Sequence, residues 1–311
     1  MQFNWAFIAY QIALLICIFL YEKKEHERTK MNIIKLSIIF LIAASTNIAQ
    51  IITEADDEGN LFNTQVKIIH STSVEDDFYL YISVPKNYES SEKTYPVLYI
   101  LDGDMAYEMA ASIARYLQFG GNIPELIIVA IGYGTLNKEE GNKRQRDYSP
   151  TEKSSKPGIT GGAQNFLNFL TNELFPHIES TYRTDKNDRA VFGYSMAGMF
   201  GLYTLFNKPE TFNRYIIGSP YLLWDNAVIF NEEEEASIKF KEIKARVFIS
   251  VGSEESTEKY FNPVDELVTL LEEREYDGLI LETKVFDGST HLMGPPEAVM
   301  YGLLSVFSKE K

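Results

Sequence analysis

The most constraining feature of this 311-residue chain is the stretch AVFGYSMAGMFG at residues 190–201. An apolar run enters Gly193, a single Ser195 follows, and small residues then lead into more apolar sequence. This pattern is typical of a strand that turns sharply into a helix with a serine at its tip, a nucleophile elbow of the form G-x-S-x-G. The fifth position holds Ala197 instead of glycine. Because Gly and Ser are also ordinary turn residues, the rest of the chain must support a catalytic interpretation.

Apolar runs of strand length alternate with helical patterns on both sides of this stretch. Continuous apolar runs such as 95–103 and 125–133 are typical of strands that are buried on both faces. The chain is therefore predicted to form a doubly wound α/β fold, with helices on both faces of a mostly parallel sheet and an N-terminal antiparallel strand pair. Ligands bind such sheets at the carboxyl ends of the strands. The predicted strands cover residues 64–72, 77–85, 95–103, 125–133, 189–195, 214–220, 245–252 and 281–288, and the predicted helices cover 106–117 and 165–182 and begin at 196, at Asn262–Pro263 and after Pro295–Pro296.

Composition excludes several functional classes. The chain is 45% hydrophobic and 13% aromatic, which is ample for a large core, and its formal net charge is −15. A nucleic-acid partner is excluded, because phosphate binding needs clustered Lys and Arg. Cys17 is the only cysteine, so residues after it have no disulfide, no thiol nucleophile and no cysteine metal site. The acidic run at 232–235 is predicted to be a solvated loop or helix face.

The first 50 residues are predicted to be a leader. Residues 5–21 are apolar and nearly long enough to span a bilayer. Residues 31–50 have the three regions of a signal peptide, with cleavage expected near Ala49–Gln50. We expect translation to start at Met31 and the protein to be exported, to the periplasm or outside the cell. The alternative is a membrane anchor at residues 5–21, and membrane association is expected only through this N-terminal segment.

The chain offers few histidines as a base for Ser195. A serine hydroxyl is a poor nucleophile without a base. In chains with this elbow the catalytic residues follow one another along the sequence in the order serine, acid, histidine. His26 lies in the leader, His70 in an early strand and His177 in a helix before the elbow. His291 follows the last predicted strand in a loop rich in Gly, Ser and Pro, and is therefore the predicted base.

The acid that orients this base is expected after the strand at 245–252. Glu254 and Glu255 follow that strand, and successive residues of an extended segment point in opposite directions, so at most one can face His291. A carboxylate in this place would hold the tautomer of the imidazole and stabilise the imidazolium. Further candidates for the acid are Asp225, Asp265, Asp277 and Asp287.

Two backbone N–H groups are predicted to form an oxyanion hole. The N–H of Met196 lies at the start of the helix after Ser195, where unpaired donors and the helix dipole stabilise negative charge. The second donor is expected in the turn LDGD at 101–104, and we predict the N–H of Asp104. Gly103 would allow the substrate to approach closely.

Two insertions, 134–160 and 221–244, are predicted to determine specificity. The first is polar, punctuated by Gly and Pro, and too long for a simple connection. Arg144 and Arg146 are candidates for binding an acidic substrate group, although Arg146 paired with Asp147 or a neighbouring carboxylate would brace the loop instead. Trp224 is a candidate wall of an apolar acyl or aryl pocket, or a packing residue.

Together these residues resemble the putative-esterase (esterase D-like) branch of the α/β-hydrolases, closest to its siderophore (enterobactin-type) esterase-like group. The resemblance covers about residues 64–308, and five motifs in the family's order carry it. It implies an α/β-hydrolase fold for residues 51–311, with Ser195 as nucleophile, His291 as base and Glu255, three residues after Gly252, as acid. The chain departs from the family where Trp224 stands alone in place of an aromatic pair, and some relatives have a weakened acid. The motifs are VLYILDGD (97–104), RDYSPT (146–151), residues 161–185, residues 193–220 and FDGSTHLMGPPEAVMYGL (286–303).

The predicted function is that of a serine esterase, which cleaves carboxylic esters of small molecules through an acyl-enzyme. It requires no metal and no organic cofactor. An acyltransferase on the same triad is the alternative, because only the exclusion of water separates the two reactions. A non-catalytic binding module on the same scaffold is disfavoured by the presence of both Ser195 and His291.

Overall fold

A computed structural model describes residues 53–54 and 64–307 of the chain. The predicted leader at 1–50, with its proposed signal peptide and its alternative anchor at 5–21, lies outside these residues. Among the helices of the described part, none combines the length and the apolar character needed to cross a membrane.

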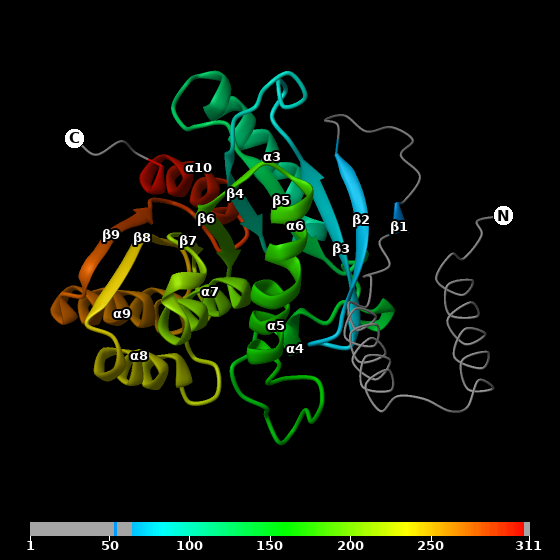
Figure 1. Ribbon diagram of the computed structural model, residues 1–311. Helices are drawn as coiled ribbons and strands as arrows, with labels where there is room; N and C mark the ends of the chain where they lie inside the picture. Colours follow the sequence, from blue (N-terminus) through cyan, green and yellow to red (C-terminus); the bar gives the residue numbers. More distant parts are fainter. Residues whose placement is uncertain (1–52, 55–63, 308–311) are drawn as a thin grey trace, which may run out of the picture. The chain divides into compact units, whose positions relative to one another are not determined.

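The described residues form one sheet of nine strands in the order β1-β2-β3-β5-β4-β6-β7-β8-β9 (Figure 1). The first pairs, β1–β2, β2–β3 and β3–β5, are antiparallel, and every other pair is parallel. This confirms the predicted mostly parallel sheet with an N-terminal antiparallel pair. The strands are β1 (Thr53–Glu54), β2 (Gln65–Ser71), β3 (Asp76–Ser83), β4 (Tyr95–Ile100), β5 (Ile127–Gly132), β6 (Thr184–Tyr194), β7 (Arg214–Gly218), β8 (Glu242–Gly252) and β9 (Asp277–Phe286).

Helices cover both faces of the sheet, as an α/β-hydrolase fold requires. Side chains of α3 and α10 pack on one face, and those of α5 to α9 pack on the other. The helix predicted at 165–182 is continuous, but a π-helical turn at Leu170–Leu174 divides it into α5 and α6. The α-helices are α3 (Gly103–Phe119), α4 (Arg144–Asp147), α5 (Ala163–Phe169), α6 (Phe175–Thr181), α7 (Met196–Asn207), α8 (Val228–Lys239), α9 (Asn262–Arg274) and α10 (Gly294–Val306), and shorter turns are η1 (Lys138–Glu140), η3 (Pro209–Thr211) and the π-helical η4 (Thr257–Phe261).

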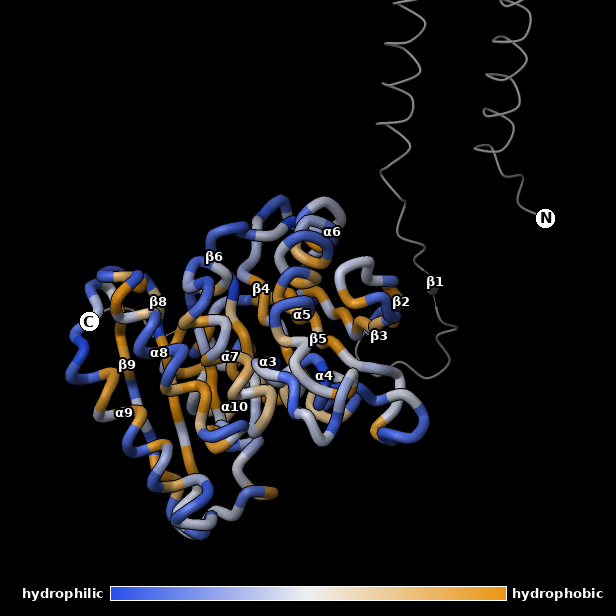
Figure 2. Tube along the Cα trace, turned by 90° about the horizontal axis from the view of Figure 1, so that it is seen from below, coloured by the Kyte–Doolittle hydropathy of each residue, from blue (hydrophilic) through white to orange (hydrophobic). Residues whose placement is uncertain are grey.

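The core lies on both sides of the central strands. Along β4 and the residue that follows it, Val97, Tyr99 and Leu101 pack into the cluster on one face, whereas Leu98 and Ile100 pack into the cluster on the other. This alternation follows from the two-residue period of a strand and explains why the sequence is a continuous apolar run. Hydrophobic residues accordingly gather along the strands and hydrophilic ones along the periphery (Figure 2).

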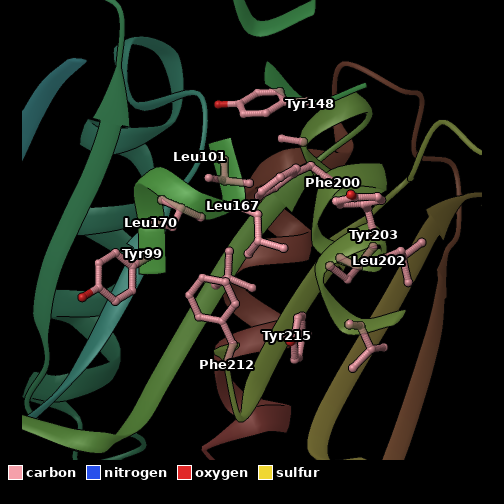
Figure 3. Close-up of a cluster of buried hydrophobic side chains, with 14 of the residues drawn as sticks. Tyr99, Leu101, Tyr148, Leu167, Leu170, Phe200, Leu202, Tyr203, Phe212 and Tyr215 are labelled. Carbon is pink, nitrogen blue, oxygen red and sulfur yellow. The ribbon is translucent and has the colours of Figure 1, made fainter. Parts of the chain in front are cut away.

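Large aromatic side chains fill the space between the sheet and the helices α5, α6 and α7. Tyr99, Phe212 and Tyr215 extend from the sheet side, and Phe200 on α7 reaches toward Tyr148 (Figure 3). Each of these side chains is almost completely buried. Close packing of this kind fixes α7 against the sheet, and with it the turn that precedes α7.

The acidic run at 232–235 lies on a helix with Glu234 and Glu235 exposed, as predicted, but one of its members is not solvated. This helix is α8, and the side chain of Glu233 is fully buried. Its carboxylate accepts hydrogen bonds from the Arg274 guanidinium at 3.1 Å and the Tyr276 hydroxyl at 2.8 Å. One of the four glutamates therefore ties α8 to α9 and the following strand. A run of identical residues gives no sign of which member is buried.

Candidate active site

Ser195 stands alone at the tip of the turn between β6 and α7. Its backbone has φ 59° and ψ −116°, a conformation that non-glycine residues rarely adopt and that functional sites often hold. A Cβ on Gly193 would lie 2.3 Å from the carbonyl oxygen of Ala197, so only glycine fits there. Ala197 itself is fully buried, which shows that the turn accommodates a methyl group at the fifth position of the motif.

His291 and Glu255 form a hydrogen-bonded pair after the ends of β9 and β8. The distance from His291 Nδ1 to Glu255 Oε2 is 2.6 Å. The Glu255 side chain is fully buried, and its other oxygen, Oε1, accepts from the Ser219 hydroxyl at 2.5 Å and from the Gly252 N–H at 2.9 Å. Burial alone would raise the pKa of Glu255, but the hydrogen bonds from His291, Ser219 and Gly252 outweigh it and lower the pKa.

The other predicted candidates for acid and base lie elsewhere. Glu254 is exposed next to the buried Glu255, but the segment is a turn closed by a hydrogen bond from the Glu255 N–H to the Gly252 carbonyl, and not the extended chain on which the prediction relied. Asp225 accepts a hydrogen bond from Thr151, and none of Asp265, Asp277 and Asp287 has a hydrogen bond to His291 in the described part of the chain. His70 is paired with Asp77 on the surface, and burial lowers the pKa of His177 on α6.

Ser195 and His291 line the same cavity, which has a volume of about 460 Å³ and lies at the carboxyl ends of the strands. No hydrogen bond joins the Ser195 hydroxyl to His291 within residues 64–307, so the shared cavity is what brings the two side chains together. Hydrogen bonds of this kind are often long before a substrate binds. Most of the wall is apolar, and its apolar members include Met105, Met109, Leu136, Leu292, Pro295 and Pro296.

A second cavity of about 470 Å³ lies at the opposite end of the sheet, where β5 begins and β3 ends. Its lining includes Lys86, Arg115 and Glu125 but no histidine. The cavity at Ser195 is therefore the candidate active site.

Aromatic rings flank the imidazole of His291. The ring of Tyr260, in the turn η4, stacks on it with centroids 4.3 Å apart, and Tyr194 lies at 5.1 Å. Sequence reasoning missed Tyr260 and Ser219 as neighbours of the pair. Ser219 follows β7 in a G-S-P sequence, and its position at the carboxyl end of a strand was the available signal.

The two predicted oxyanion donors begin the helices that follow the neighbouring strands β4 and β6. Met196 is the first residue of α7 and Asp104 the second of α3, so neither N–H has an intrahelical acceptor. The carboxylate of Asp104 accepts from the Tyr81 hydroxyl and from the N–H groups of Tyr133 and Gly134 at 2.6, 2.6 and 2.9 Å. The role predicted for Gly103 is corrected: its missing side chain makes room for the backbone of Ile131, which a Cβ would approach to 2.8 Å, and not for a substrate.

Arg146 does not line the cavity. Its guanidinium donates to both oxygens of Asp147, at 2.6 and 3.0 Å, and to Asp76 at 2.9 Å. These contacts match the bracing interpretation and leave no support for substrate binding. Arg144 does line the cavity, where its guanidinium holds both oxygens of Asp102 at 2.7 and 2.8 Å.

Trp224 also lies outside the cavity lining. It is 4% exposed and belongs to the hydrophobic core, so the pocket-wall interpretation has no support in the structure. Its indole N–H is 3.2 Å from the Thr151 hydroxyl, and the ammonium of Lys153 lies 3.9 Å from the ring centroid. Trp224 therefore joins the insertion at 221–244 to the one at 134–160.

The fold and the elbow define an α/β-hydrolase, and three comparisons identify the family. Residues 71–291 match the family model described as putative esterase. The chain is 27% identical over 259 residues to the ferri-bacillibactin esterase BesA of Bacillus subtilis (strain 168). The aligned region covers 77% of this chain and 88% of BesA.

Solved structures agree with this family. A structure titled as the BES protein from Bacillus cereus has a TM-score of 0.73 and 28% identity, covering 83% of this chain and 99% of that one. An IroE-like serine hydrolase from Shewanella oneidensis has a TM-score of 0.70 and 26% identity, and the match covers 79% of this chain and 80% of that one. The chain belongs to the putative-esterase family, and it is a carboxylic ester hydrolase.

Proposed function

We propose that the protein is a serine esterase with Ser195 as nucleophile, His291 as general base and Glu255 as the acid that orients the base. The observation that carries this proposal is the 2.6 Å contact between His291 and the buried Glu255 beside the elbow serine. Nδ1 of His291 faces the carboxylate, which leaves Nε2 as the nitrogen that accepts a proton.

The reaction follows from these positions. Ser195 Oγ attacks the ester carbonyl while Nε2 of His291 takes its proton, and the N–H groups of Met196 and Asp104 stabilise the negative oxygen that forms. His291 then gives the proton to the departing alcohol, and an acyl-enzyme remains. Water, activated by the same histidine, attacks the acyl group and releases the acid. Every step uses side chains and backbone groups of this chain.

Hydrolysis is favoured over transfer to a second alcohol by the access of solvent to the base. The His291 side chain is 29% exposed, so water can reach the group that activates it. An acyltransferase must keep water away from its acyl-enzyme.

The substrate is proposed to be a small-molecule ester. The similarity to the ferri-bacillibactin esterase BesA makes ester-containing siderophores the first substrates to test. Export remains a proposal that rests on the signal-peptide pattern of residues 31–50. Mass spectrometry of the mature N-terminus would test it, and a chain that retains residues 5–21 would favour the membrane anchor.

A fluorophosphonate probe followed by peptide mass spectrometry tests the nucleophile directly. We expect a single modified serine, Ser195, and no labelling and no ester hydrolysis in Ser195→Ala. Circular dichroism of the variant should be unchanged, because the alanine removes only the hydroxyl. Modification of another serine in the wild-type protein would contradict the assignment.

A further inference from the structure

The charged groups around the Ser195 cavity carry an inference about its substrate. Three residues with formally charged side chains line this cavity, namely Asp102, Asp104 and Arg144. The described lining therefore carries two formal negative charges and one formal positive charge. The field inside an apolar-walled cleft depends strongly on such an imbalance, because its walls screen charge poorly.

The cation is already compensated. Nε and Nη2 of Arg144 donate to the two oxygens of Asp102 at 2.7 and 2.8 Å, a bidentate geometry that matches the fork of the guanidinium. Burial would lower the pKa of Arg144, but Asp102 outweighs burial and raises it, so the pair stays ionic. A substrate anion at this place would have to compete with Asp102 for the same cation.

The second carboxylate has only neutral partners. Asp104 accepts from one tyrosine hydroxyl and two backbone N–H groups, and no ion pair to it is present in the described residues. Hydrogen bonds from neutral groups satisfy its oxygens, but they do not cancel its charge. Asp104 therefore adds a negative potential to the cavity that it lines, although its oxygens are held by Tyr81, Tyr133 and Gly134, which are not among the lining residues.

The mouth of the same cavity is apolar. Met105, Leu136 and Leu292 line it and are 71%, 60% and 88% exposed. A ligand that covers these side chains gains hydrophobic free energy in proportion to the apolar area removed from water. The mouth thus favours an apolar group next to the scissile ester.

From these contacts we infer that the site selects esters that carry an apolar group and no negative charge near the scissile bond. This inference rests on the proposed function and names the substrate class of the same site. The selection is made by the pair Asp102–Arg144 and by Asp104.

A matched pair of substrates tests the inference. Mono-4-nitrophenyl adipate ends in a carboxylate, and its methyl ester has the same chain without the charge. We expect kcat/KM to be at least about tenfold lower for the anion at low ionic strength, and the difference to shrink in about 0.5 M NaCl, where the Debye length is only a few Å. Equal or faster turnover of the anion, or a difference that grows with salt, would overturn the inference.

Asp102→Asn tests the origin of the selection. Asn tolerates the left-handed backbone of Asp102 (φ 54°), and the change frees Arg144 to bind an anion. The ratio of kcat/KM for the anionic ester to that for the neutral ester should rise about tenfold, and an unchanged ratio would contradict the role of the pair. Asp188→Asn is the matched control, because Asp188 in β6 holds Arg214, the first residue of β7, with the same bidentate geometry outside the cavity lining. Its loss should leave the ratio unchanged.

The two proposals fail in different ways. If the neutral ester is not hydrolysed, or if Ser195→Ala still hydrolyses it, the proposed catalytic function is wrong. If Ser195 is required but the anion is the better substrate, only the charge selection is wrong.

Discussion

The pKa values of two buried carboxylates in this protein are shifted in opposite directions. Glu255 and Asp147 both have fully buried side chains, and each forms an ion-pair contact, with His291 and Arg146 respectively. Yet the pKa of Glu255 is lowered and that of Asp147 is raised. The first lies in the candidate active site, and the second anchors the insertion at 134–160.

The difference comes from the donors around each carboxylate. At Asp147, burial is the largest effect and raises the pKa, and the hydrogen bonds from Arg146 and Tyr133 do not fully offset it. At Glu255, burial is also the largest single effect, but a backbone N–H, a hydroxyl and the imidazole together outweigh it. A carboxylate that must remain charged to hold a base needs such a set of donors, whereas a brace does not.

The largest expected effect on kcat distinguishes His291 from the other histidines. His291→Ala should lower kcat by at least about three orders of magnitude, because the nucleophile loses its base. The measurement is steady-state kinetics on an activated aryl ester. His177→Ala is the control and should retain most activity, since His177 lies on α6 outside the cavity lining. A His177 variant as inactive as the His291 variant would contradict the assignment.

The next effect concerns the orienting acid. Glu255→Gln should lower kcat by roughly 10²–10⁴ with little change in KM, because the carboxylate holds the imidazole and does not touch the ester. Glu254→Gln is a matched control one residue away on the exposed side and should stay within a few-fold of the wild-type enzyme. Impairment of the Glu254 variant alone would show that the wrong glutamate had been chosen.

The sequence predicted the fold well because its signals are local. Apolar runs of strand length, a single elbow and prolines at helix starts each depend on neighbouring residues. The elbow pattern and chain order predicted Ser195 and His291, whereas strand ends left Glu254 and Glu255 open and only the family resemblance implied Glu255. Residues 1–50 lie outside the described part, and their predicted role stays a prediction.

Pairings between distant segments could not be predicted in the same way. The contact of Arg144 with Asp102 joins residues 42 apart, and that of Trp224 with Thr151 joins residues 73 apart. Arg144 and Arg146 are two residues apart in one short helix, and no local pattern shows which of them faces the cavity. Only the folded positions of Asp76, Asp102 and Asp147 decide it.

A third test removes the brace. Asp147→Asn should lower the free energy of unfolding by about 3 kcal/mol, because it leaves the partly buried guanidinium of Arg146 with fewer partners. The kcat of the folded enzyme should change only a few-fold. Denaturant titration with parallel kinetics measures both, and exposed Glu139→Gln is the control for loss of one charge in the same insertion. A loss of kcat as large as that of Glu255→Gln would remove the distinction between brace and active site.

A smaller effect is expected at the hydroxyl that supports the acid. Ser219→Ala removes one donor to Glu255 and should lower kcat about tenfold, the equivalent of one hydrogen bond to a charged group. KM should not change, and the acidic limb of the pH–kcat profile should shift. Ser250→Ala is the matched control: its hydroxyl is equally buried, lies on the adjacent strand and has no hydrogen-bond partner in the described residues, so kcat should not change. Equal effects of the two truncations would indicate a packing role only.

The smallest effect, the pH dependence of stability, sharpens the comparison because its sign differs between the two carboxylates. The pKa of Glu255 is lower in the folded protein than its ordinary value, so its contribution is present above the unfolded pKa of about 4.3 and is lost as the pH falls toward the folded pKa. The pKa of Asp147 is raised, so the pH-dependent part of its contribution is present below the unfolded pKa of about 3.9 and is lost as the pH rises through the folded pKa, whereas the ion pair with Arg146 persists above it. The stability of the wild-type protein relative to Glu255→Gln should therefore shrink on acidification, whereas its stability relative to Asp147→Asn should grow. Thermal midpoints of the three proteins between about pH 7 and pH 4 measure both differences. Parallel trends would mean that the two carboxylates share one environment, and the assignment of one to catalysis and the other to bracing would lose its electrostatic support.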